Sequence, residues 1–77
     1  MLLKELRYVL AIHTYGTMAK ASQHLYISQP ALSKYIQNLE DTLSVELFHR
    51  NNGRLTLTFA GEQYVSAATK MLEIFEH

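Results

Sequence analysis

The sequence predicts a mainly α-helical fold with one small two-stranded hairpin. Apolar residues recur at helical spacing in four segments of the 77-residue chain. One short stretch, residues 47–57, instead combines alternating apolar residues with an Asn-Asn-Gly turn. A chain of this length has room for one small domain, which buries only about 60% of its unfolded surface, so an added partner surface would stabilise it.

Apolar spacing on either side of Gly16 predicts the first two helices. The first helix carries Leu3, Leu6, Val9, Leu10 and Ile12, and Gly16 is a natural stop at its C-terminal end. Thr17 is suited to cap the second helix, whose inward residues are Met18, Ala21, Ser22 and Leu25. Two of these are small enough to let another helix approach closely, and Tyr26-Ile27 then forms a short link.

The third helix is predicted over residues 28–43. Ser28 is a suitable N-cap, and Pro30 lies in the first turn, where a missing N–H costs nothing. One apolar stripe runs along this helix at steps of four, three and four residues, through Leu32, Ile36, Leu39 and Leu43. Ser44 ends the helix without a glycine, which is a weaker stop.

The hairpin and a last helix complete the chain. Asn51-Asn52-Gly53 is predicted to turn, and Leu55-Thr56-Leu57 to form a strand. Thr58 is suited to cap the last helix, whose apolar stripe of Gly61, Val65, Ala68, Leu72 and Phe75 is typical of a coiled-coil seam of about two heptads. The stripe can pack on the domain's own core or against a second copy. Tyr64, Met71 and Ile74 lie off it, which favours burial on two sides.

This order of elements, with a tight link before the third helix, predicts a winged helix-turn-helix over residues 1–58 and a long linker helix over residues 59–77. The third helix then keeps one polar face in solvent, made of Pro30, Ser33, Lys34, Gln37, Asn38 and Asp41. Such side chains can bond to base edges in a DNA major groove, and a helix N-terminus favours phosphate. The ordinary alternative is a solvated helix face.

The charges give a mixed indication. Lys plus Arg equals Asp plus Glu, seven each, whereas nucleic-acid binders are usually basic. Four cations, Lys20, Lys34, Arg50 and Arg54, nevertheless fall on the expected DNA face, and Arg54 is suited to a narrow A·T-rich minor groove. The acidic Glu40, Asp41 and Glu46 lie close to the same face. The neutral total motivates a second hypothesis, a winged helix that binds protein rather than DNA.

Other classes of function find little support. The chain has no cysteine, and its longest apolar run, Tyr8 to Ile12, is far too short to span a membrane. The N-terminus lacks the pattern of a secretory signal. A small enzyme or metal protein is motivated only by His13, His24, His49 and His77, which lack the close spacing of metal ligands. No catalytic set and no metal site is therefore predicted.

Six stretches of the chain follow a known pattern: Leu6-Arg7-Tyr8, Ala21-Ser22-Gln23-His24-Leu25, Ser28-Gln29-Pro30-Ala31-Leu32-Ser33-Lys34, Ile36-Gln37-Asn38-Leu39-Glu40, Leu47-Phe48-His49-Arg50 and Leu57-Thr58-Phe59-Ala60-Gly61. Over essentially all 77 residues the chain resembles the N-terminal DNA-binding domain of LysR-type transcriptional regulators. The third and fifth stretches at this spacing are highly specific.

The resemblance implies a set of DNA contacts. Base-edge contacts are expected from Gln29, Pro30, Ser33 and Lys34 at the start of the recognition helix, and from Arg54 in the minor groove. Backbone contacts are expected from Thr17, Lys20, Ser28, Gln37, Arg50 and Asn52. The chain departs from the family pattern at three positions. Ser44 stands where glycine is frequent, which implies a differently shaped turn after the third helix. Tyr35 and Thr56 stand where polar and basic residues are frequent, which implies weaker nonspecific binding to DNA.

The resemblance also implies an assembly and a setting. Members are bacterial cytoplasmic regulators, associated with the nucleoid, that bind interrupted palindromic promoter sites as dimers and often form tetramers. The linker helix forms the dimer, which here implies Val65, Ala68, Leu72 and Phe75. A small-molecule effector binds a C-terminal domain that is absent here, so the chain is expected to be a fragment ending in the linker helix, without a cofactor.

Overall fold

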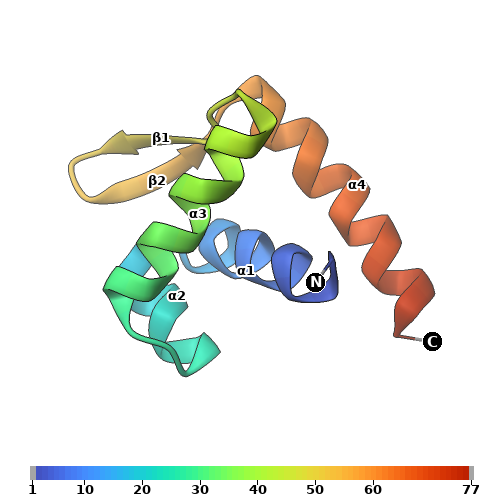
Figure 1. Cartoon of the computed structure of the whole chain (residues 1–77), viewed down its shortest axis with the longest axis horizontal. Helices are drawn as coiled ribbons and strands as arrows, with labels where there is room; N and C mark the ends of the chain where they lie inside the picture. The colour runs from blue at the N-terminus through green and yellow to red at the C-terminus, as the bar shows by residue number, and fades with distance from the viewer. Residues whose placement is uncertain (1, 77) are drawn as a thin grey trace.

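The computed structural model describes residues 2–76. Within them lie four helices and one two-stranded antiparallel sheet (Figure 1). The elements are α1 (Leu2–Tyr15), α2 (Met18–Leu25), α3 (Gln29–Leu43), β1 (Phe48–Asn51), β2 (Arg54–Leu57) and α4 (Phe59–Phe75). The predicted fold class, mainly α with a small wing and a long last helix, is confirmed.

Two left-handed residues set the turns on either side of α2. Gly16 ends α1 with φ +81° and donates its N–H to the Ile12 carbonyl oxygen at 2.8 Å. The Thr17 hydroxyl then caps α2 by accepting the Lys20 N–H at 3.1 Å, as predicted. Tyr26 ends α2 with φ 59°, so the chain turns sharply into α3. The turn of the helix-turn-helix is therefore only Tyr26–Ser28.

The ends of α3 are both set by serine. The Ser28 hydroxyl accepts the Ala31 N–H at 3.2 Å, which confirms the predicted cap. Ser44 adopts φ 59°, and the following Val45 N–H donates to the Glu40 carbonyl oxygen at 3.3 Å. The prediction that Leu43 continues the buried stripe is wrong, because Leu43 is 42% exposed. The last turn of α3 runs beyond the core, and residues 44–46 after it are exposed too.

The hairpin has a two-residue turn of type I′ geometry. Asn52 and Gly53 both have positive φ, 51° and 83°, which matches the right-handed twist of the strands. The register pairs Arg50 with Leu55 and Asn51 with Arg54. The hairpin is fastened to the helices by the Leu55 N–H, which donates to the Gly16 carbonyl oxygen at 2.8 Å.

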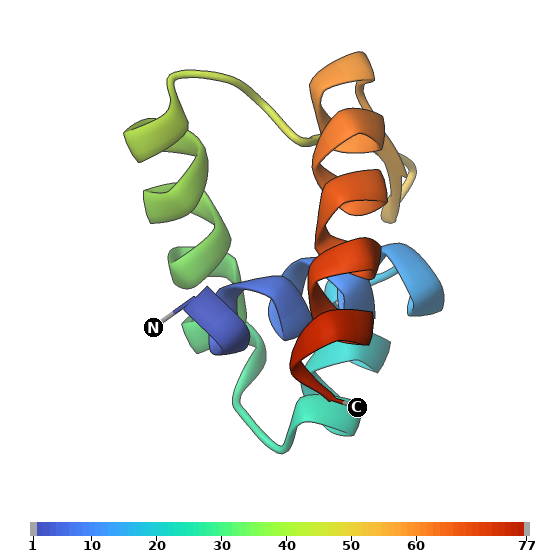
Figure 2. The same ribbon diagram turned by 90° about the vertical axis from the view of Figure 1, so that its right-hand side faces the viewer.

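The core lies around α1, which runs between α3 and α4 in Figure 1 and passes behind α4 in Figure 2. Its buried apolar residues come from every element: Leu6, Val9, Ile12, Met18, Ala21, Leu32, Ile36, Leu39, Leu47, Phe48, Leu55 and Ala68. Because each helix contributes only one stripe, the opposite faces of α2 and α3 stay free for a ligand.

The last helix packs along α1. Its N-cap Thr58 accepts the Gly61 N–H at 2.9 Å, as predicted. The Tyr64 hydroxyl donates a hydrogen bond to the Glu5 carboxylate, and Arg7 forms an ion pair with Glu76. The predicted linker helix of residues 59–77 thus corresponds to Phe59–Phe75, and His77 lies outside the described residues.

Candidate nucleic-acid interface

The predicted reading face of α3 is open to solvent. Gln29, Pro30, Lys34 and Gln37 are exposed, and Ser33 is half-buried. On the opposite side of the helix the stripe of Leu32, Ile36 and Leu39 is buried. The polar face therefore projects from the domain over at least the first three turns of the helix, which is the geometry that a groove-reading helix needs.

A shallow hollow lies where the starts of α2 and α3 meet the hairpin. It has a volume of about 270 Å³ and is lined by Thr17, Met18, Ala19, Gln29, Arg50, Gly53 and Leu55. Three of the predicted contact residues, Thr17, Gln29 and Arg50, thus come together from α2, α3 and β1. Because α2 and α3 both begin at this hollow, their N-terminal dipoles add to the positive charge of Arg50.

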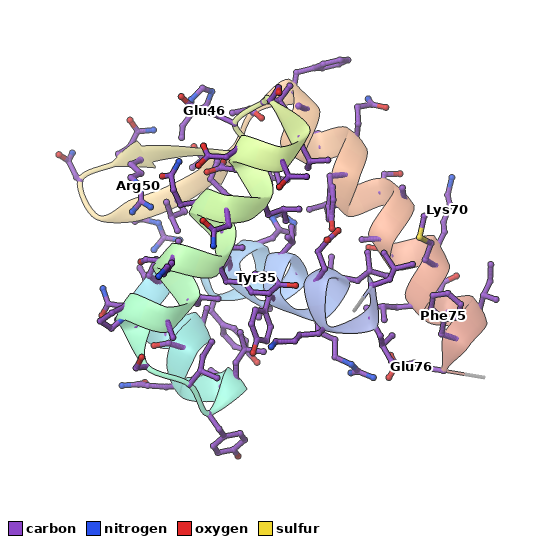
Figure 3. The ribbon with its side chains drawn as sticks, viewed as in Figure 1. Tyr35, Glu46, Arg50, Lys70, Phe75 and Glu76 are labelled. Carbon is purple, nitrogen blue, oxygen red and sulfur yellow. The ribbon has the colours of Figure 1, made fainter. Side chains whose placement is uncertain are left out.

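A second, larger groove continues between the far half of α3 and the hairpin. It has a volume of about 590 Å³ and is lined by Gln37, Glu40, Asp41, Ser44, Val45, Glu46, Phe48 and Arg50. Arg50 lines both spaces, and Figure 3 shows it on the hairpin with Glu46 near the far end of α3. Gln37 donates its amide to Asp41 at 3.0 Å. The second N–H of the same amide group stays available for the predicted contact from Gln37.

Within residues 2–76, the four predicted cations form no ion pair. Across residues 2–76, no carboxylate lies within 4.0 Å of the charged groups of Lys20, Lys34, Arg50 or Arg54. The ion pair found there joins Arg7 to Glu76, away from the reading face. Unpaired cations beside exposed helix N-termini can meet phosphate without first breaking an ion pair.

The two hairpin arginines point to opposite faces of the sheet. Cross-strand partners share a face, so Arg50 lies with the buried Leu55, whereas Arg54 lies with Asn51. The Arg54 guanidinium folds back over the turn before α2, where a Cβ added to Gly16 would lie 2.7 Å from its Nη2. To enter a minor groove from the tip beside Asn52, Arg54 must leave this position.

Tyrosines behind the reading face connect α3 to α1 and α4. The rings of Tyr35 and Tyr8 meet edge to face at 4.8 Å, and the Lys4 Nζ lies 5.5 Å from each ring centre. Burial raises the pKa of the Tyr64 hydroxyl, and its hydrogen bond to Glu5 and the charge of Glu5 raise it further. Burial, then Glu5, raises the pKa of Tyr35. Both hydroxyls are therefore protonated at neutral pH.

The structure distributes the predicted dimer residues over two environments. Ala68 is 1% exposed, and Val65 packs against the core. Leu72 is half-buried and lines a space with residues of α1 and α2. Phe75 is 55% exposed, and its neighbours Met71 and Ile74 are 38% and 74% exposed. Ala68 thus has no surface to offer a partner, while Met71, Ile74 and Phe75 do.

The histidines within residues 2–76 form no metal-binding cluster. No group of three or more metal-ligating side chains occurs in the described part of the chain. His24 instead stacks on Tyr15 with ring centres 3.8 Å apart, and His77 lies outside the described residues. None of the helices formed by residues 2–76 combines the length and apolar character that a membrane span requires.

Some residues that line the hollow or the groove were not among the predicted contacts. Ala19 and Gly53 line the hollow, but neither has a side chain whose chemistry could have identified it. Glu40 was expected to be an unfavourable acid near DNA, yet its carboxylate accepts two backbone N–H groups, those of Leu47 and Phe48. These partners lie seven and eight residues further along, beyond the reach of any helical spacing rule.

Comparison with known proteins gives concordant matches. The family profile described as "Bacterial regulatory helix-turn-helix protein, lysR family" matches residues 3–62. A probable RuBisCO transcriptional regulator of Cyanidioschyzon merolae is 45% identical over 96% of this chain, and the chain spans 24% of that protein. The chain thus has about a quarter of the length of this curated relative.

Two solved structures share the fold closely. The DNA-binding domain in the BenM complex with benA site 1 DNA superposes with a TM-score of 0.92 at 36% identity, over 99% of this chain and 88% of that one. The corresponding domain in a CbnR complex with DNA gives 0.90 at 34% identity, over 99% and 87%.

Proposed function

The chain belongs to the LysR family of bacterial regulatory helix-turn-helix proteins, and on that premise we propose that it reads duplex DNA as a homodimer, with the start of α3 in the major groove and the hairpin at the minor groove. It is a DNA-binding domain of a transcriptional regulator and not an enzyme. The proposal concerns how it binds.

The meeting of Thr17, Gln29 and Arg50 at one hollow carries the proposal. Both helix N-termini there favour phosphate, and Arg50 adds a cation with no carboxylate of residues 2–76 within 4.0 Å. A strand of DNA backbone lying in this hollow would bring the adjacent exposed face of α3 against base edges. Backbone contacts are assigned to Thr17, Lys20, Ser28, Gln37, Arg50 and Asn52.

Base reading is assigned to the first two turns of α3. The Gln29 amide, the Ser33 hydroxyl and the Lys34 ammonium can bond to base edges, and Pro30 can contact a thymine methyl group. Arg54 is assigned to the minor groove, where a narrow A·T-rich segment attracts a guanidinium. Its present position over Gly16 makes this contact dependent on a side-chain rearrangement.

The whole protein is proposed to act as related regulators do. The solved BenM and CbnR domains were obtained in complexes with DNA. A dimer would place two reading helices on an interrupted palindromic promoter site, and the full-length protein would form tetramers. We assign small-molecule sensing to a domain outside this chain, and action to the cytoplasm, at the nucleoid. The domain itself uses no cofactor.

Selection of duplexes from a random pool, followed by affinity measurements at several salt concentrations, tests this function. Four cations per protomer neutralise roughly eight phosphates in a dimer, so the log–log slope is expected to be no steeper than about −7. Gln29→Ala and Ser33→Ala should relax the preference of the selected duplexes, whereas Lys70→Ala, on the outer side of α4 in Figure 3, should not. A salt-independent affinity would overturn the proposal.

The neutral net charge and the acidic Asp41 and Glu46 beside the larger groove favour a second candidate, a winged helix that binds a protein partner. A mobility-shift experiment at low salt separates the two functions. Absence of any shifted duplex at low salt would favour the protein-binding function.

A further inference from the structure

We propose that Glu40 is a positioning residue for DNA reading, because its carboxylate holds the start of the hairpin at a fixed place relative to the reading face of α3. The proposal rests on the DNA-binding function proposed above. It assigns a role to an acidic residue that lines the larger groove between α3 and the hairpin.

The carboxylate reaches across from α3 to the start of β1. Its Oε2 accepts the Leu47 N–H at 2.5 Å and the Phe48 N–H at 3.3 Å. Hydrogen bonds to an ionised acceptor are about twice as strong as those between neutral groups. Both bonds are partly buried, so water competes poorly for the two backbone groups. Glu40 therefore fastens this segment to the recognition helix.

The same segment is fastened on its other side to the start of α4. The Thr58 N–H donates to the Leu47 carbonyl oxygen at 3.0 Å, and the Thr58 hydroxyl donates to the Glu46 carbonyl oxygen at 2.6 Å. Figure 2 shows the chain crossing from the end of α3 to the side of the molecule where α4 lies. Leu47 thus uses its N–H toward α3 and its carbonyl toward α4.

The position of Arg50 depends on the two hydrogen bonds that the Glu40 carboxylate accepts. Arg50 lies only two residues beyond Phe48 on the same strand and lines both the groove and the hollow that contains Gln29. The relative placement of the cation on the hairpin and the base-reading residues on α3 thus depends on the bonds that Glu40 makes. Loss of these bonds would let the hairpin shift while α3 keeps its contacts to α2 and the core.

An electrostatic role and a positioning role for Glu40 predict opposite results. A solvated acid beside the DNA weakens phosphate attraction, so its removal would strengthen binding to every duplex. A positioning residue would instead weaken binding to the preferred duplex. Glu46 is the matched control, because it is an exposed acid lining the same groove and its side chain accepts no hydrogen bond from residues 2–76.

The first experiment compares the 77-residue chain with Glu40→Ala, Glu40→Gln and Glu46→Gln on the duplex selected by the parent and on an unrelated duplex of equal length. Glu40→Ala should lose about tenfold in affinity for the selected duplex and should also lose affinity for the unrelated one, because the Arg50 contact that Glu40 positions is a contact to phosphate. Glu40→Gln, whose amide oxygen can still accept, should lose less. Glu46→Gln should lose nothing. Equal or higher affinity of Glu40→Ala for both duplexes would overturn the proposal.

A double-mutant cycle separates positioning from a general loss of stability. If Glu40 places the hairpin, the penalty of Arg50→Ala should shrink by about threefold or more in the Glu40→Ala background. The penalty of Gln29→Ala, about 16 Å away along the helix axis, should stay within about twofold. Unchanged penalties at both positions, or equal shrinkage at both, would contradict the proposal. If Glu40→Ala lacks the helical content of the parent, the same cycle in Glu40→Gln decides.

Failure of the proposed function is distinguishable from failure of this inference. If the parent chain prefers no duplex, the proposed function is wrong, and the inference about Glu40 is wrong with it. If the parent chain selects a duplex and the Glu40→Ala variant binds that duplex as tightly as the parent does, only the inference about Glu40 is removed.

Discussion

Gly61 lies so close to the Leu47 carbonyl that no side chain fits between them. A Cβ added to Gly61 would lie 2.0 Å from the Leu47 oxygen and 3.1 Å from Leu57 Cδ2. The same oxygen accepts the Thr58 N–H. The first turn of α4 therefore packs directly against the backbone that leads into the hairpin. Gly61, the first residue of the apolar stripe, is glycine because the two backbones approach so closely.

Gly61→Ala should destabilise the domain by at least about 1–3 kcal/mol, because the contact is with backbone that cannot rotate away. Urea unfolding followed by circular dichroism measures the change. Gln63→Ala, at an exposed position of the same helix, is the control and should alter stability by less than about 0.5 kcal/mol. A stabilised Gly61→Ala variant, as alanine gives at an open helix position, would contradict the close contact.

Ser44→Gly should stabilise the domain by about 1 kcal/mol. Ser44 adopts φ 59° at the end of α3, a conformation that costs a residue with a side chain about that much. Thr42→Gly, two residues earlier within the helix, should instead destabilise by about 1 kcal/mol, because glycine gains nothing there and loses helix propensity. Thermal unfolding shows whether each variant is more or less stable than the parent chain. Equal losses in both would contradict a left-handed Ser44.

The raised pKa of Tyr64 predicts a loss of stability in alkali. The unfolded hydroxyl loses its proton near pH 10, whereas the folded one, buried and bonded to Glu5, keeps it to higher pH. The stabilisation is complete below about pH 10 and disappears as pH rises toward the folded pKa. Urea midpoints from about pH 9 to about pH 11 should therefore fall.

Tyr64→Phe is the control for this prediction. It lowers stability at neutral pH by removing the bond to Glu5, yet its midpoint should fall less steeply in alkali. The remaining slope includes Tyr35, whose pKa burial also raises. An equally steep fall in Tyr64→Phe would assign the alkaline transition to another group.

The opposite faces of Arg50 and Arg54 predict different binding defects. Arg50→Ala should weaken binding to all duplexes and reduce the salt slope by about 1 per protomer, because a phosphate contact carries no sequence information. Arg54→Ala should weaken binding mainly to duplexes with A·T-rich flanks. Affinities for one core site with varied flanks make the comparison. A uniform loss for Arg54→Ala would place this residue on the DNA backbone.

Exposure along α4 predicts which substitution separates dimerisation from folding. Ile74 is 74% exposed, so Ile74→Glu should abolish the dimer. The stability of the monomer fold, measured as its urea midpoint, should not change. Leu72 is half-buried and lines a space with residues of α1 and α2, so Leu72→Glu should also destabilise the fold, by about 2 kcal/mol or more. Sedimentation measures the oligomeric state. A dimer that survives Ile74→Glu would place the seam on another surface.

Features set by neighbouring residues were predictable from the sequence. Thr17, Ser28 and Thr58 were each expected to cap a helix, and each accepts an N–H from the first turn of its helix. The hairpin turn at Asn52-Gly53 and the apolar stripes were predictable for the same reason. Capping bonds, turn conformations and helical spacing all involve residues within a few positions of one another.

Contacts between distant segments were decided only by the tertiary structure. Leu43 was expected to be buried because its spacing fits the stripe, but no spacing rule shows where a core ends. The position of Arg54 over Gly16, the choice of glycine at residue 61 and the bonds of Glu40 to Leu47 and Phe48 depend on how the packed helices bring backbone groups together. The sequence by itself thus determined which elements form and which face of α3 is polar. Packing around α1 determined which side chains remain free to meet DNA, because burial is a property of the assembled core and not of any one helix.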